Sequence, residues 1–151
     1  MLCITATPAV LRHLRSLIAG NLDSAQGLAR AADCAQSPAL ARTLRACAVT
    51  REEFAAELRS ILKALGDVDA VPAPTRAQRW WADLDDLAQR GGDRAVLNEV
   101  LRAEEWIRSG YNAAVREGGA DELLDVIQRQ AESTRRVELH LRLLREVPRF
   151  L

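Results

Sequence analysis

The sequence has few aromatic residues, a single lysine and no long apolar run. Aromatic residues make up 4% of the 151 residues while hydrophobic residues make up 48%, so the core should be aliphatic and, with so many alanines and leucines, helical. No segment reaches the roughly 20 apolar residues that cross a bilayer, and no membrane partner is expected. The start, "MLCITATPAVLRHLRSLIAG", lacks a basic end followed by an uninterrupted apolar run. We therefore expect no secretion signal and a cytoplasmic protein.

No excess of charge of either sign is present. Twenty-one basic and twenty-one acidic side chains cancel, so no strong overall field attracts nucleic acid or an anionic membrane. Lys63 is the only lysine, and the arginines are scattered among acidic residues on predicted helix faces. A GC-rich genome explains this arginine preference more simply than nucleic-acid binding does. No nucleic-acid partner is expected.

The three cysteines, Cys3, Cys34 and Cys47, are odd in number and share no metal-ligand spacing. On consecutive antiparallel helices that turn near Gln36, Cys34 would lie about 3 Å below the turn and Cys47 about 16 Å below it. A disulfide needs alpha carbons within roughly 7 Å, so this pair cannot bridge. Reduced, structural thiols are expected.

Capping signals and apolar periodicity predict an all-α protein of one domain over residues 1–151. Thr7-Pro8 and Ser37-Pro38 are typical helix starts, and Gly66 and Gly118-Gly119 are typical helix ends. Each long periodic segment carries one apolar stripe, which favours a four-helix bundle. The expected helices span residues 8–35, 38–65, 93–116 and 121–147, with a connection over 66–92.

The length of this connection bears on the topology. It contains a segment, "RAQRWWADLDDLAQR", that predicts a short helix ended by Gly91-Gly92-Asp93. Its 27 residues exceed the about two to eight that usually join neighbouring bundle helices. They can travel the length of a roughly 40 Å bundle and leave the second and third long helices parallel, as in ferritin-like folds. A simple up-down-up-down order, with the tryptophan helix across one end, is the alternative.

A polar layer is expected at the middle of the bundle. Apolar residues recur along the second helix at steps of three and four, and the position in this series between Cys47 and Phe54 is occupied by Arg51. The corresponding position of the third helix is occupied by Glu104. A buried guanidinium needs a partner, so we expect Arg51 and Glu104 to pair and fix the register of the helices. The other polar residues expected on the buried helix faces at this height are Asn21, Gln130 and Thr134.

A small-ligand pocket or a metal site at the same height are the functional alternatives. Di-iron bundles combine glutamates with Glu-x-x-His motifs on facing helices, and no Glu-x-x-His occurs in this chain. His13 and His140 lie near helix ends, and Arg51 would repel a divalent ion. We therefore expect no metal ligands, no cofactor and no catalytic residues, since no Ser/His/Asp or Cys/His set is visible either.

Several stretches resemble a bacterial four-helix-bundle family. Asp23, Gly27 and Ala31-Ala32 resemble its Asp-Gly-x-x-Gly-aromatic…Ala-Ala pattern, and "TREEFAAEL" is similar to its Arg-x-x-Phe-Ala-x-Glu-Leu core. "RWWADL", "GGDRAVLNEVLRAEE" and Tyr111 follow its third-helix stretch in order. The family is ferritin-like, common in proteobacteria and catalogued as a domain of unknown function. The resemblance, from about Leu11 to Arg145, implies a ferritin-like fold and no particular activity.

The chain also departs from that family. Ser24 and Leu28 replace its usual glycine and aromatic residue, and Glu138 stands where its fourth helix usually carries a histidine. These departures weaken the metal binding suspected for the superfamily.

The tryptophans are the expected interaction surface. Trp80 and Trp81 are the only adjacent aromatics, and Trp106 lies on the flank of the third long helix. Tryptophan is enriched at interface hot spots, so we expect a homodimer or another protein partner at these residues, whereas their burial against the bundle would leave a monomer. The predicted function is a non-enzymatic interaction or stress-associated module. The alternative is a metal-binding di-iron or manganese relative of ferritin with oxidase or storage activity.

Overall fold

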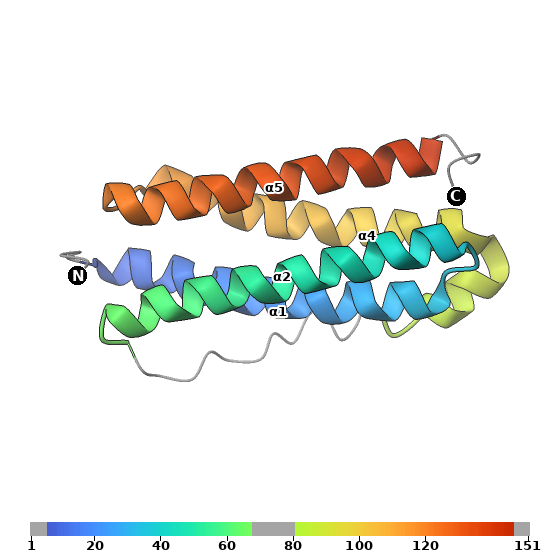
Figure 1. The fold of residues 1–151 in the computed structure, drawn as a ribbon, viewed down its shortest axis with the longest axis horizontal. Coiled ribbons are helices and arrows are strands. Elements are labelled where there is room, and N and C mark those ends of the chain that lie inside the picture. Colours follow the sequence, from blue (N-terminus) through green and yellow to red (C-terminus); the bar gives the residue numbers. More distant parts are fainter. Residues whose placement is uncertain (1–5, 68–80, 147–151) are drawn as a thin grey trace.

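The computed structural model describes residues 6–67 and 81–146, and within them all regular structure is helical. Four helices form a bundle: α1 (Pro8–Cys34), α2 (Pro38–Ala64), α4 (Leu84–Glu117) and α5 (Asp121–Glu146), labelled as in Figure 1. The expected all-α four-helix bundle is confirmed. Residues 68–80, which include Trp80 and the start of the predicted short helix, lie outside the described residues.

The first two helices begin at the expected capping pairs. The Thr7 hydroxyl accepts a hydrogen bond from the backbone N–H of Val10 at 3.2 Å, and the Ser37 hydroxyl accepts one from Leu40 at 3.2 Å. Each cap satisfies one N–H that the first helical turn leaves unpaired, and the proline that follows has none to lose. The α1–α2 turn is therefore encoded locally.

Helix α4 is bent at the pair of glycines where the sequence predicts a break. The backbone leaves the helical conformation at Gly92 (φ 65°, ψ −157°), so α4 consists of two helical segments joined at this kink. Only glycine takes this backbone conformation without strain. Asp93, expected to cap its own helix, instead accepts hydrogen bonds from the backbone N–H groups of Gln36 at 2.7 Å and Ser37 at 2.9 Å. The start of the straight part of α4 thus holds the α1–α2 turn.

The contacts at both ends of the bundle fix the helix directions. The Asp93 bonds place one end of α4 beside the α1–α2 turn, and at the other end His13 Nε2 approaches Glu117 Oε2 to 3.8 Å. Helix α4 is therefore antiparallel to α1 and runs in the same direction as α2, while α5 is antiparallel to α4 (Figure 1). Helix α1 packs on α2 and α4, α5 packs on α4, and α2 and α5 have the sparsest contact.

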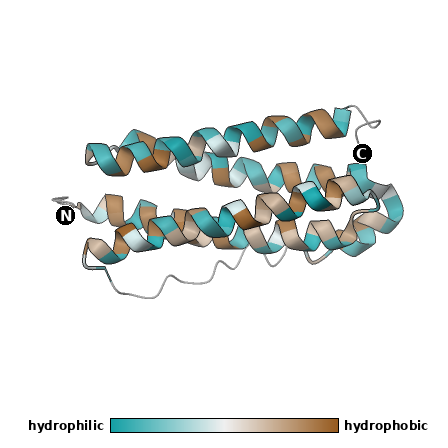
Figure 2. Cartoon of the chain, viewed as in Figure 1, coloured by the Kyte–Doolittle hydropathy of each residue, from teal (hydrophilic) through white to brown (hydrophobic). Residues whose placement is uncertain are grey.

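Two apolar clusters fill the interior, one on each side of a polar layer. The cluster near the α1–α2 turn includes Leu28, Leu44 and Leu97, and the other includes Leu14, Leu58 and Ile127. In Figure 2 apolar and polar residues alternate along every helix, as expected for amphipathic helices with one buried stripe. No helix in residues 6–67 or 81–146 is long and apolar enough to span a membrane.

Glycine permits the close packing of α1 against α4. A Cβ added at Gly20 would meet the Cδ1 atom of Ile107 at 3.1 Å, which is tighter than ordinary van der Waals contact, and one added at Gly110 would meet Leu17 at 3.5 Å. These two positions bring the backbones together just beside the polar layer.

Candidate functional site

The centre of the bundle holds a buried ion pair. The Arg51 Nη2 of α2 donates to Glu104 Oε2 of α4, and the two side chains are only 2% and 1% exposed. The second terminal nitrogen of Arg51, Nη1, donates to the Thr134 hydroxyl of α5 at 2.7 Å. One guanidinium thus joins three helices at the middle of their length.

Neighbouring polar groups make further hydrogen bonds to this pair. The Ser24 hydroxyl of α1 donates to Glu104 Oε1 at 3.0 Å, so both carboxylate oxygens are bonded and all four helices contribute. The Thr134 hydroxyl, which accepts from Arg51, donates to the Gln130 carbonyl at 2.8 Å. Burying two charges is costly, and such additional hydrogen bonds are what make a buried pair tolerable.

The thiol of Cys47 lies close to this ion pair. Burial, followed by the Glu104 carboxylate, raises the pKa of Cys47 to about 11. Cys47 therefore stays a neutral thiol near pH 7 and is a poor nucleophile or metal ligand there.

A second group of hydrogen-bonded polar residues lies beside the ion pair, and we call it the tyrosine chain: Asn21, Tyr111, Gln130, Glu57 and Arg129. Asn21 Nδ2 donates to the Tyr111 hydroxyl at 2.8 Å, and that hydroxyl donates to Gln130 Oε1 at 2.7 Å. Gln130 Nε2 donates to Glu57 Oε1 at 2.7 Å, and Glu57 accepts from Arg129 at the surface. Burial raises the pKa of Tyr111 to about 12, which keeps its hydroxyl protonated and able to donate.

The five polar residues expected at mid-height are all buried, but the structure divides them. Arg51, Glu104 and Thr134 form one hydrogen-bonded group, whereas Asn21 and Gln130 belong to the tyrosine chain. The Gln130 carbonyl, through Thr134, is the link between the two. Asn21 does not bond to Arg51 as an acceptor, and its Oδ1 has no partner within the described residues.

Three further polar residues of this region were missed by sequence reasoning. Ser24 and Glu138 were noted only as departures from a family pattern, and Tyr111 only as part of the resemblance to that family. Glu138, buried at 2% exposure, accepts from Arg108 at 2.8 Å and Arg142 at 2.8 Å on Oε1. Glu138 could have been predicted by the same spacing that identified Arg51, because it occupies the buried helical position between Thr134 and Leu141.

The carboxyl groups of this region do not converge on a metal site. In the part of the chain that the structure describes, no three His, Cys, Asp or Glu side chains are grouped so that they could hold a metal ion. Both Glu104 oxygens are bonded, and the arginines on Glu138 Oε1 would repel a cation beside it. The other oxygen, Glu138 Oε2, has no partner among residues 6–67 and 81–146.

The described tryptophans do not share one environment. Trp81 is half-buried against the apolar cluster near the α1–α2 turn, and its indole N–H is buried with no hydrogen-bond partner among the described residues. Trp106 on α4 is 64% exposed. Because Trp80 lies outside the described residues, the predicted tryptophan surface stays a prediction.

A family model described as "Domain of unknown function (DUF2383)" matches residues 9–117. The chain belongs to this family. The family match spans α1, α2 and α4 and so includes Asn21, Arg51, Glu104 and Tyr111, but it ends before α5 with Gln130 and Thr134. No curated protein and no solved structure matches the chain.

Proposed function

We propose that this chain is a non-enzymatic, cytoplasmic bundle of ferritin-like topology that acts by binding protein. The observation that carries the proposal is the ion pair at mid-height. A catalytic bundle needs side chains with open coordination or bonding positions at its centre. Here Arg51 and Ser24 occupy both oxygens of Glu104, and burial keeps the nearby Cys47 thiol and Tyr111 hydroxyl protonated by raising the pKa of each.

The direction of the helices supports the topology. Helices α2 and α4 run the same way (Figure 1), as the second and third long helices do in a ferritin-like bundle with one crossover connection. The free thiols of Cys34 and Cys47 support a reducing compartment. That the chain is stress-associated stays a prediction.

Exposed apolar side chains support a binding role. Among the described residues, large hydrophobic side chains are exposed at Val49, Trp106, Leu139 and Leu143. A bundle whose interior is satisfied and whose surface carries such groups is better suited to contact another protein than to transform a small molecule.

Metal loading is the decisive test. Purified protein should be incubated with Fe(II) and, separately, with Mn(II), freed of loose metal, and measured by elemental analysis together with oxygen consumption. We expect well under one metal ion per chain and no iron-dependent oxygen uptake. Stoichiometric metal or oxidase activity would overturn the proposal in favour of a metal-binding ferritin relative.

The feature that favours this second candidate is Glu138 Oε2, a buried carboxylate oxygen with no hydrogen-bond partner in the part of the chain that the structure describes. The matched variant is Glu138→Gln. If iron binds to the wild-type protein, loss of that iron in Glu138→Gln places the ion at this oxygen.

A further inference from the structure

The outer face of α5 carries a stripe of exposed residues at regular spacing. The residues follow steps of four and three, which keep them on one side of a helix: Glu132, Arg136, Leu139, Leu143 and Glu146. All five are exposed, with Leu139 at 56% and Leu143 at 49%. The packing partners of α5 within the bundle are α4 and α2, so none of the four helices covers this stripe.

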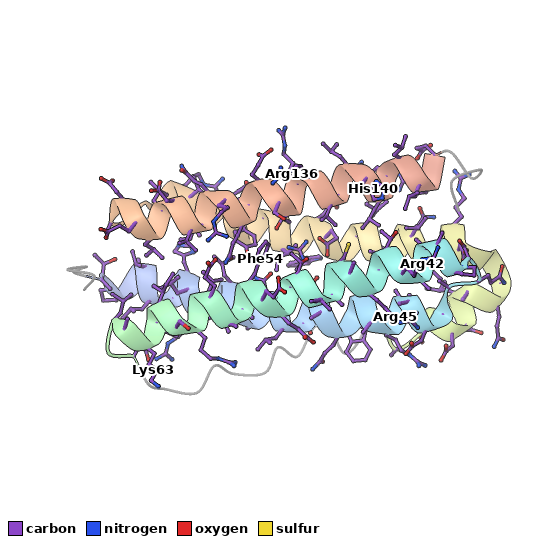
Figure 3. All side chains as sticks on the ribbon, in the orientation of Figure 1. Arg42, Arg45, Phe54, Lys63, Arg136 and His140 are labelled. Carbon is purple, nitrogen blue, oxygen red and sulfur yellow. The ribbon has the colours of Figure 1, made fainter. Side chains whose placement is uncertain are left out.

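The two leucines are one helical turn apart and form the centre of the stripe. Isolated exposed leucines are ordinary on a protein surface, but two of the four large exposed hydrophobic residues of the described chain share this turn. Polar residues flank them: Arg136, labelled in Figure 3, lies one turn before Leu139, and Glu146 follows Leu143 by three residues. This arrangement, apolar in the middle and charged at both ends, is that of a short helix-packing seam.

The charges specify what fits against it. If a second α5 packs on the stripe in the antiparallel direction, Leu139 meets Leu143 of the other copy, and Arg136 meets Glu146 of the other copy. Two-fold symmetry makes each of these contacts twice. In a parallel pair Arg136 would face arginine and Glu146 would face glutamate, which is repulsive.

Both charged groups are available for such a contact. Within the described ranges Arg136 makes no ion pair, and the exposed Glu146 bonds only to its half-buried neighbour Arg145, at 2.9 Å. The formal net charge of zero means that two copies do not repel each other overall.

We propose that the chain forms a homodimer through antiparallel packing of α5 on α5, centred on Leu139 and Leu143. The proposal rests on the proposed function in that it names a second copy of this chain as the protein that is bound. It uses a surface different from the expected tryptophan surface. Since the seam contains only four leucines in the dimer, the dissociation constant should be on the order of tens of micromolar.

Sedimentation velocity over a range of concentrations tests the dimer. The wild-type protein should sediment as a monomer–dimer mixture, and Leu139→Ser/Leu143→Ser should weaken the dimer by about a hundredfold or more. Val49→Ser, which removes an equally exposed hydrophobic side chain from α2, is the matched control and should leave dimerisation unchanged.

A charge exchange tests the antiparallel register. Arg136→Glu and Glu146→Arg should each weaken the dimer by about fivefold, because each places like charges together at both symmetric contacts. The double variant Arg136→Glu/Glu146→Arg restores opposite charges and should dimerise within about twofold of wild type. All these positions are exposed, so folding is not at risk.

The result that overturns the dimer differs from the result that overturns the proposed function. A wild-type protein that stays monomeric at several hundred micromolar, an equal effect of Val49→Ser, or failure of the charge exchange to restore assembly would each remove this dimer. Metal analysis of the same samples decides the proposed function independently, whatever the state of assembly.

Discussion

The ion pair and the tyrosine chain are both buried at mid-height, yet they satisfy their polar atoms to different degrees. In the ion pair both oxygens of Glu104 are bonded, and the Arg51 terminal nitrogens both donate. The tyrosine chain contains neutral groups in its buried part, leaves Asn21 Oδ1 without a partner among the described residues, and ends at the half-buried Glu57 and the exposed Arg129. The difference follows from desolvation, because a buried charge tolerates far less loss of bonding than a buried amide or hydroxyl.

The largest effect is expected from breaking the ion pair. Arg51→Ala leaves Glu104 charged and unpaired in the interior, so the free energy of unfolding should fall by about 3–5 kcal/mol. The double variant Arg51→Met/Glu104→Leu removes both charges and should lose much less. Urea denaturation of the three proteins measures this, and an Arg51→Ala protein as stable as wild type would show that the pair contributes nothing.

Removing the hydroxyl from the tyrosine chain should have an intermediate effect. Tyr111→Phe keeps the ring and its packing but leaves Asn21 Nδ2 and Gln130 Oε1 each without one hydrogen bond. We expect the free energy of unfolding to fall by about 1–3 kcal/mol, measured by urea denaturation. A loss as large as that of Arg51→Ala would abolish the distinction between the charged and the neutral group.

Asp23, on the same helix as Asn21 and Ser24, extends the comparison to a carboxyl group with no ion pair among the described residues. Burial raises the pKa of Asp23 from 3.8 to about 6. The folded state therefore binds this proton more tightly than the unfolded state does, so ionisation of Asp23 lowers stability progressively between about pH 4 and pH 6.

Asp23→Asn removes this penalty. The variant should be more stable than wild type by about 1 kcal/mol at neutral pH, allowing for partial exposure, and equally stable below about pH 3.5. Thermal melts of both proteins at several pH values would show the difference growing as pH rises. A constant difference at all pH values would contradict the raised pKa.

The smallest effect is expected at the exposed end of the tyrosine chain. The Arg129 side chain is 57% exposed, and Glu57 keeps its bond from Gln130 when Arg129 is removed. Arg129→Ala should therefore change the free energy of unfolding by less than about 0.5 kcal/mol. A larger loss in urea denaturation would mean that the surface end supports the buried end.

The helices and part of the central layer could be predicted from the sequence because both follow from spacing. The capping residues and apolar stripes predicted α1 and α2. Arg51 and Glu104 were predicted as buried because each is a charged residue at a position where the helical period places an apolar one. Hydrogen-bond partners are not visible in this way. Whether the Tyr111 hydroxyl meets Asn21 and Gln130 depends on how three helices are rotated about their axes.

The role of Asp93 and the stripe on α5 were not predicted, for other reasons. Gly91-Gly92 predicts the break that is found at Gly92, but the hydrogen bonds from Gln36 and Ser37 to Asp93 depend on how distant parts of the chain meet in space. Leu139 and Leu143 lie on the face opposite the buried seam. Apolar periodicity identifies the long buried stripe of a helix, and a second, shorter apolar stripe on the exposed face does not stand out beside it.

The sparse contact between α2 and α5 has a consequence for local stability. Long polar side chains, those of Arg51, Gln130 and Arg129, span this side of the bundle, whereas Gly20 and Gly110 pack α1 tightly on α4. Partial unfolding should therefore begin by separation of α5 from α2, with α1 still packed on α2 and α4. In native-state hydrogen exchange, amides of α5 should exchange at a lower opening free energy than those of α1.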